Sequence, residues 1–157
     1  MNKECAKQIA SSAEDRLFDE LSQLIEHSQR QAISQVNSTL TLLFWQIGKR
    51  INEDILQNRR ADYGKQIVSK LSTQLKNRFG KNFELRNVRR MMQFAEQFQN
   101  VEIVAALSRH LSWSHFVEIL PIKKQEAKMF YAQEIINQKL GIRELRNLIS
   151  TKTFERT

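Results

Sequence analysis

The chain has 157 residues, of which 41% are hydrophobic, enough for the core of one domain. Its four glycines and one proline are too few for the many turns of a sheet protein, so the composition favours long helices. The formal net charge is +8, and residues 59–90 hold ten Lys or Arg against two Asp or Glu, which equals the whole excess.

The N-terminal segment, residues 1–12, is polar, and we expect it to be flexible. It lacks the apolar run of a signal peptide, and no segment is apolar over the ~20 residues that span a bilayer. The single cysteine, Cys5, excludes an internal disulfide and fits a reducing environment. We therefore expect a cytoplasmic protein that does not enter a membrane.

A long helix is predicted next, because a capping pattern at residues 11–15 marks a helix start. Apolar residues then recur at three- or four-residue steps, which favours one helix, straight or bent near residues 37–38. A long amphipathic helix commonly packs against a copy of itself, so we expect a homo-oligomer through this helix. Its apolar positions are Leu17, Phe18, Leu21, Leu24, Ile25, Val36, Leu40, Leu43, Phe44, Trp45, Ile47, Ile51 and Ile55.

A helix-turn-helix-like unit, which a wing could accompany, is predicted in the basic region. Residues 57–64 connect the long helix to a second helix, which ends at residues 79–80 because glycine commonly follows a helix C-terminus. Residues 81–82 form a turn, and a third helix opens at Glu84, whose charge suits a helix N-terminus.

The third helix, residues 85–98, has one apolar and one basic side on a helical wheel. The apolar side consists of Leu85, Val88, Met91, Met92 and Ala95. The opposite side consists of Arg86, Arg90, Gln93 and Gln97, with Asn87 and Arg89 at its flanks. We expect this second side to face outward and to carry no acid after Glu84.

Such a basic side fits duplex DNA, because Arg matches the edge of guanine and Gln or Asn matches adenine. Cations on the preceding helix and turn, Lys70 among them, are placed to contact phosphates. The alternative is a solvated face that only aids solubility. The candidate nucleic-acid contacts are Lys76, Arg78, Lys81, Arg86, Asn87, Arg89, Arg90 and Gln93.

Four shorter helices are predicted at residues 101–110, 112–120, 124–139 and 142–149. His115 could serve as a base or ligand, but we interpret it as a hydrogen-bonded packing residue, with Ser112 as a helix cap and Trp113 in the core.

The triplet Glu126-Ala127-Lys128 matches the E-x-K part of a nuclease signature. It lies in a helical pattern, whereas that chemistry needs carboxylates on adjacent strands. We therefore expect no catalytic site, no metal site and no cofactor.

Several blocks together resemble a known family, over about residues 20–156. They read FWQIGKRI, YGKQIVSKLSTQL, FGKNFELRNVRRMMQF, LSWSHFVEIL, MFYAQEI and IRELRNLIS. They resemble the N-terminal domain of YhcG-like proteins, a bacterial family that joins this helical region to a C-terminal PD-(D/E)xK nuclease domain. In that family a serine is usual where Glu84 stands, and a Trp-Ser pair where residues 140–141 stand.

The resemblance implies a DNA-binding, non-catalytic N-terminal domain that targets or assembles a nuclease on DNA. The sequence thus predicts an all-α fold with a long N-terminal helix and a helix-turn-helix-like domain. We expect a helical domain over residues 13–150 and a frayed tail over residues 151–157 that leads to an absent nuclease domain. The alternatives are a homo-oligomerisation or protein-interaction module and a binder of structured RNA.

Overall fold

Every element in the computed structural model, which describes residues 3–57, 63–151 and 153–156, is helical. The predicted all-α class is confirmed, and the described residues contain no strand that could form a wing. The chain divides into two compact units, residues 1–36 and 37–157, and each is described by itself.

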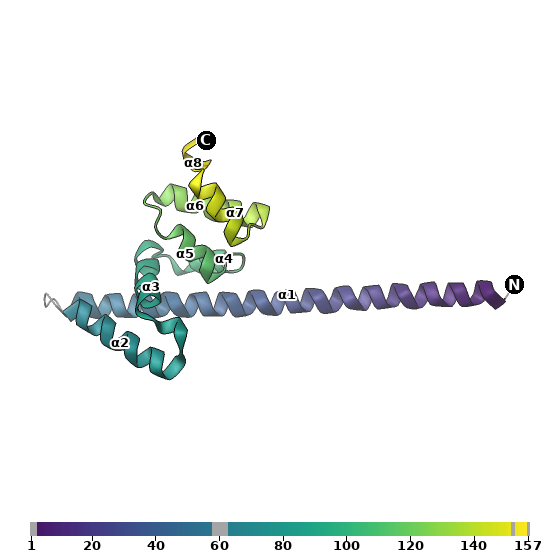
Figure 1. The fold of residues 1–157 in the computed structure, drawn as a ribbon, viewed down its shortest axis with the longest axis horizontal. Coiled ribbons are helices and arrows are strands. Elements are labelled where there is room, and N and C mark those ends of the chain that lie inside the picture. The colour runs from purple at the N-terminus through teal and green to yellow at the C-terminus, as the bar shows by residue number, and fades with distance from the viewer. Residues whose placement is uncertain (1–2, 58–62, 152, 157) are drawn as a thin grey trace. The chain divides into compact units, whose positions relative to one another are not determined.

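The long helix, α1, spans Lys3–Gln57 (Figure 1). It begins before the capping pattern predicted at residues 11–15, and it stays helical through residues 37–38. In residues 18–36 of the first unit, whose side chains the structure describes, the large apolar side chains are exposed, and no described element of that unit covers them. They are Phe18, Leu21, Leu24, Ile25, Ile33 and Val36.

In the second unit, the end of α1 is followed by α2 (Tyr63–Phe79), the 3₁₀ turn η1 (Lys81–Phe83) and α3 (Leu85–Gln97). The predicted connection at residues 57–64 falls mostly on residues 58–62, outside the described residues. The predicted stop of α2 is confirmed: Gly80 has a φ of 103°, a conformation that glycine adopts without steric cost.

Four further helices follow close to the predicted ranges, α4 (Val101–Ser108), α5 (Trp113–Ile119), α6 (Gln125–Gln138) and α7 (Ile142–Ser150), and a short helix that was not predicted, α8 (Thr153–Arg156), comes after them. The end of α6 agrees with the predicted end at residue 139: Lys139 is the C-cap and takes the left-handed conformation, with a φ of 52°. The last helix, α8, lies in the segment expected to be frayed.

Two apolar cores hold the second unit together, and α3 contributes to both. The smaller core joins Ile51 of α1, Val68 of α2 and Val88 of α3. The larger core joins Trp45 of α1 and Phe94 of α3 to residues of α4, α5, α6 and α7. In Figure 1, α2 lies on the opposite side of the α1 end from α5, α6 and α7. Because α3 packs on two sides, little of its surface is left for solvent.

Candidate nucleic-acid interface

The α3 helix is turned about its axis relative to the prediction. Phe94 and Phe98, which the prediction did not place in the core, are fully buried, whereas Met92, placed in it, is half-buried. At 100° per residue this moves the exposed side by about 60°. The cause is the larger core, which covers the side of α3 that carries Phe94. The exposed residues of α3 are Arg86, Arg89 and Glu96.

The expected outward side of α3 is therefore only partly outward. Arg90, Gln93 and Gln97 are half-buried. The Gln93 side-chain amide donates to the Leu120 carbonyl at 3.4 Å. Glu96, just outside the predicted side and beside its Arg89 flank, is exposed two turns after Arg89, so the side of α3 that is exposed does carry an acid after Glu84.

Arg86 and Arg89 are the cations of α3 that remain exposed and unpaired among the described residues. Both are exposed, and among the described residues neither forms an ion pair or a hydrogen bond. Their guanidinium groups are thus available to an anion from outside the chain, which is the property the sequence prediction required of this helix.

Asn87 has an internal role that the sequence did not reveal. Its amide nitrogen donates to the Asn82 carbonyl at 2.7 Å, and its amide oxygen accepts from the Trp113 indole at 2.9 Å. These bonds link α3 to the preceding turn and to α5. Because both ends of the amide are engaged, we assign Asn87 to the fold rather than to a base contact.

The cations predicted on α2 and η1 are all exposed. Lys76 lies 3.8 Å from Glu84, and both side chains are more than half exposed, so this ion pair is weak. The Arg78 guanidinium lies over the Phe79 ring, 5.1 Å from its centroid. Lys81 is exposed on η1, and within the described part of the chain its side chain contacts no carboxylate.

The exposed side of α2 carries more than the cations predicted on this helix. Only Val68 and Ser72 of this helix are buried, and no Asp or Glu occurs between Tyr63 and Phe79. Lys65 and Lys70 are exposed with polar neutral residues between them. The sequence prediction missed Lys65, although the absence of acids from this helix was a signal that could have identified it.

The block around His115 is structural, as predicted. The Ser112 hydroxyl caps α5, and the His115 ring accepts from the Ser112 backbone N–H at 3.0 Å, which forms a capping box. The other ring nitrogen lies 2.8 Å from the Leu140 carbonyl. Trp113 packs edge-on against Phe44 and Phe94. His115 therefore joins α5 to the end of α6, which is a packing role.

No catalytic arrangement is evident in the described residues. The Glu126-Ala127-Lys128 triplet lies on α6, and Lys128 is buried, which lowers the pKa of its ammonium group. Nowhere in the described ranges do three His, Cys, Asp or Glu side chains lie close enough to hold a metal ion together. No described helix is long and apolar enough to cross a membrane.

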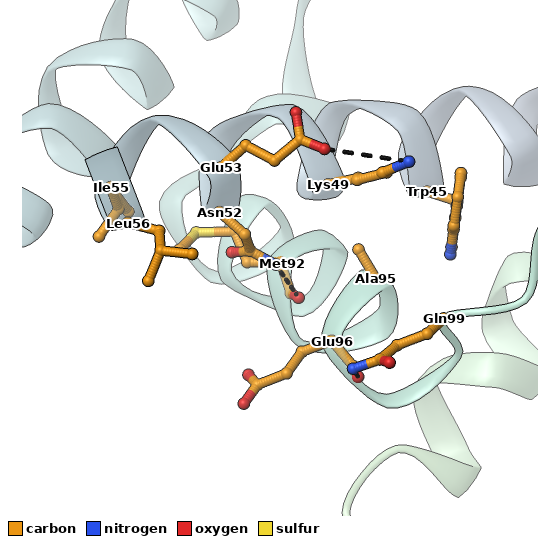
Figure 2. A pocket seen from close by; sticks show the side chains of 10 residues that line it. All are labelled: Trp45, Lys49, Asn52, Glu53, Ile55, Leu56, Met92, Ala95, Glu96 and Gln99. Carbon is orange, nitrogen blue, oxygen red and sulfur yellow. Dashed lines mark hydrogen bonds and ion pairs between the residues drawn. The ribbon is translucent and has the colours of Figure 1, made fainter. Parts of the chain in front are cut away.

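A groove of about 850 Å³ lies between the end of α1 and α3 (Figure 2). Its apolar wall includes Trp45, Leu56 and Met92. Some of the polar groups that line it are engaged with one another: Lys49 lies 3.9 Å from Glu53, and the Asn52 amide donates to the Met92 carbonyl at 2.9 Å. None of the predicted nucleic-acid contacts lines this groove, so it is a separate feature from the basic surface.

Comparisons with known proteins agree with the resemblance seen in the sequence. Residues 20–156 match the family model of the DUF1016 N-terminal domain. The Escherichia coli (strain K12) protein named Putative nuclease YhcG is 27% identical, over 90% of this chain and 46% of that protein. The chain thus spans less than half the length of this relative. No solved structure matches significantly.

Proposed function

The chain belongs to the DUF1016 N-terminal domain family, and on that basis we propose that it binds duplex DNA and catalyses nothing by itself. In a longer relative such a domain would target or assemble a nuclease on its substrate. The name of the Escherichia coli relative, a nuclease, supports this proposal by similarity.

The observation that carries the proposal is the charge of α2, η1 and α3. Glu84 is the only acid between Tyr63 and Ala95. The cations of this segment, apart from the half-buried Arg90, are exposed. Local excess of positive charge on one run of helices is the usual footprint of a nucleic-acid-binding protein. The exposed cations are Lys65, Lys70, Lys76, Arg78, Lys81, Arg86 and Arg89.

The proposal divides these residues by position. Lys76, Arg78 and Lys81, at the end of α2 and on η1, contact phosphates and fix the register. Arg86 and Arg89 are the exposed cations of α3, and they contact DNA next to the phosphates that Lys76, Arg78 and Lys81 bind. Arg90 and Gln93 are half-buried, so they take at most a secondary part.

Binding of a fluorescent 20-base-pair duplex, followed by anisotropy, tests the proposal. The double variant Arg86→Ala/Arg89→Ala should bind at least tenfold more weakly, because each lost contact is worth about 1–3 kcal/mol. Arg50→Ala/Arg143→Ala is the matched control, since it removes the same charge from exposed positions on α1 and α7. A parent protein that does not bind duplex DNA would refute the function. A double variant that binds like the parent would refute the α3 assignment.

A homo-oligomerisation module is the second candidate, and the exposed apolar residues of the first unit favour it. At 100° per residue, Phe18, Leu21, Ile25 and Val36 form one stripe, with Asp19, Glu20 and Glu26 outside it. Phe18, Ile25 and Val36 are each 59–70% exposed. An uncharged stripe of this kind fits the same stripe on a second copy, as in a coiled coil.

Sedimentation equilibrium tests the second candidate. We expect the parent to self-associate and Leu21→Glu/Ile25→Glu to be monomeric, since two charges would then enter the stripe. The control His27→Glu/Arg30→Glu changes exposed residues outside the stripe and should leave the association unchanged. A monomeric parent at millimolar concentration would rule this candidate out. DNA binding and self-association are compatible, because dimers of such domains read paired half-sites.

A further inference from the structure

The small exposed surface of α3 limits how this helix can bind DNA. A helix that enters the major groove needs one side open along its length. The described residues of α3 leave only Arg86, Arg89 and Glu96 exposed, and Glu96 would bring a carboxylate towards the phosphates. Beyond its first turns, α3 therefore lacks the exposed side that a helix needs to enter the major groove.

The α2 helix meets the requirement. At 100° per residue, its polar residues cover about half of its circumference and its apolar residues cover the other half. With 17 residues it is about 25 Å long, at about 1.5 Å per residue. The exposed residues of the polar half are Lys65, Gln66, Ser69, Lys70, Thr73, Gln74, Lys76 and Asn77.

The order of side chains across this half is informative. Gln66, Thr73 and Asn77 lie along its middle, with Ser69 beside them. The lysines flank this row unevenly: Lys65 and Lys76 lie at one border, and Lys70 lies between the middle and Gln74, which occupies the other border. Neutral hydrogen-bonding groups thus form a central row, with two lysines along one side of it and Lys70 on the other. The Thr73 hydroxyl donates to the Ser69 carbonyl at 3.1 Å and keeps its acceptor capacity.

The other half of α2 is firmly attached. Val68 and Leu71 pack in the smaller core, and the Ser72 hydroxyl donates to the Phe83 carbonyl at 2.8 Å. The Tyr63 hydroxyl donates to an Asp54 carboxylate oxygen at 2.6 Å, which ties the start of α2 to α1. The polar half is therefore presented on a rigid support, as a recognition helix requires.

From this arrangement we infer that α2, rather than α3, enters the major groove of B-form DNA; the inference rests on the proposed DNA binding. Gln66, Ser69 and Asn77 face the base edges at the floor of the groove. The bordering lysines contact the phosphates of the two strands. The major groove is about 12 Å wide and admits a helix, whereas the deep, narrow groove of A-form RNA does not, so duplex DNA is the partner.

Directed cleavage of DNA tests the placement of α2. Cys5 is the only cysteine, so Cys5→Ser/Thr73→Cys gives one attachment point for an iron–EDTA chelate in the middle of α2. The matched control, Cys5→Ser/Glu102→Cys, carries the chelate on the exposed side of α4. On a labelled 30-base-pair duplex we expect cleavage from position 73 at least fivefold above that from position 102. Equal or lower cleavage, with both proteins bound, would overturn the inference.

The salt dependence of binding gives a second, independent test. Lys65→Gln/Lys70→Gln should reduce the slope of log K against log salt by about 1.8, at about 0.9 per lost phosphate contact. Lys123→Gln/Lys124→Gln removes the same charge from exposed positions outside α2 and should leave the slope nearly unchanged. An unchanged slope in the α2 variant would contradict the inference while leaving DNA binding intact. A parent protein that binds no DNA would instead refute the proposed function, and the placement of α2 with it.

Discussion

At the scale of single residues, exposure and hydrogen bonding separate side chains that look alike in the sequence. Arg86 and Asn87 are neighbours that both fit a base-reading helix by residue type. Arg86 is exposed, whereas both ends of the Asn87 amide are engaged inside the protein. The sequence could not distinguish these roles, because the partner of Asn87, Trp113, lies 26 residues away in the chain.

We predict that Asn87→Ala destabilises the fold by about 1–3 kcal/mol, because the Trp113 indole N–H loses its acceptor. Urea unfolding measures this free energy. Arg86→Ala, one residue earlier and exposed, should change it by less than about 0.5 kcal/mol. An Asn87→Ala protein with parental stability but lost DNA binding would show that Asn87 contacts DNA after all.

Glu84 offers a second prediction at this scale. It stands at the N-cap of α3, yet its side chain makes no capping bond, and it lies beside Lys76. Glu84→Ser should stabilise the fold by up to about 1 kcal/mol, because serine caps a helix well and the exposed ion pair contributes little.

The same substitution should also tighten DNA binding, roughly fivefold, because it removes the only acid between Tyr63 and Ala95. Fluorescence anisotropy at constant salt measures the change. Glu126→Ser, at an exposed position at the start of α6, is the charge-matched control. Weaker binding by Glu84→Ser would show that the carboxylate assists the interface.

At the scale of helices, most boundaries were predictable because their signals are local. Gly80 ends α2, and Ser112 caps α5, as the sequence indicated. The orientation of α3 was not predictable, because it depends on which distant helices cover Phe94. The lack of acids on α2 was visible in the sequence. That its polar half is exposed was not, because this depends on α1 and α3 packing only against the opposite half.

The crossing of α1 and α3 gives a prediction of its own. A Cβ atom at Gly48 would lie 2.0 Å from the Met91 carbonyl oxygen, so the two helices approach too closely there for any larger residue. Alanine normally stabilises a helix relative to glycine by about 1 kcal/mol. We expect Gly48→Ala to do the reverse and to lower the unfolding free energy by at least about 1–3 kcal/mol.

Gly64→Ala is the control for this experiment. A Cβ atom at Gly64, near the start of α2, would meet only the Ile55 side chain, at an ordinary 3.5 Å. This variant should be as stable as the parent or slightly more stable. If Gly48→Ala and Gly64→Ala changed the unfolding free energy by the same amount in urea, the close contact of α1 with α3 at Gly48 would be contradicted.

At the scale of the whole molecule, charge and apolar surface are separated along the chain. Residues 1–58 carry six Lys or Arg and eight Asp or Glu, and the large exposed apolar side chains of the first unit lie there. Most of the excess positive charge lies on α2, η1 and α3 of the second unit, where residues 63–97 hold eight Lys or Arg against two Glu. We interpret this separation as two proposed roles on different units: self-association through the first unit and DNA binding through the second.

The affinity of the parent protein for a 20-base-pair duplex at several salt concentrations tests this account most directly. Contact with five to seven phosphates predicts a log–log slope of about −4.5 to −6.3, at about −0.9 per phosphate. Duplex RNA of the same sequence should bind at least tenfold more weakly, since its major groove does not admit a helix. A slope near zero would contradict the claim that this basic surface contacts duplex DNA. Equal binding of duplex RNA would contradict the claim that a helix of this surface enters the major groove.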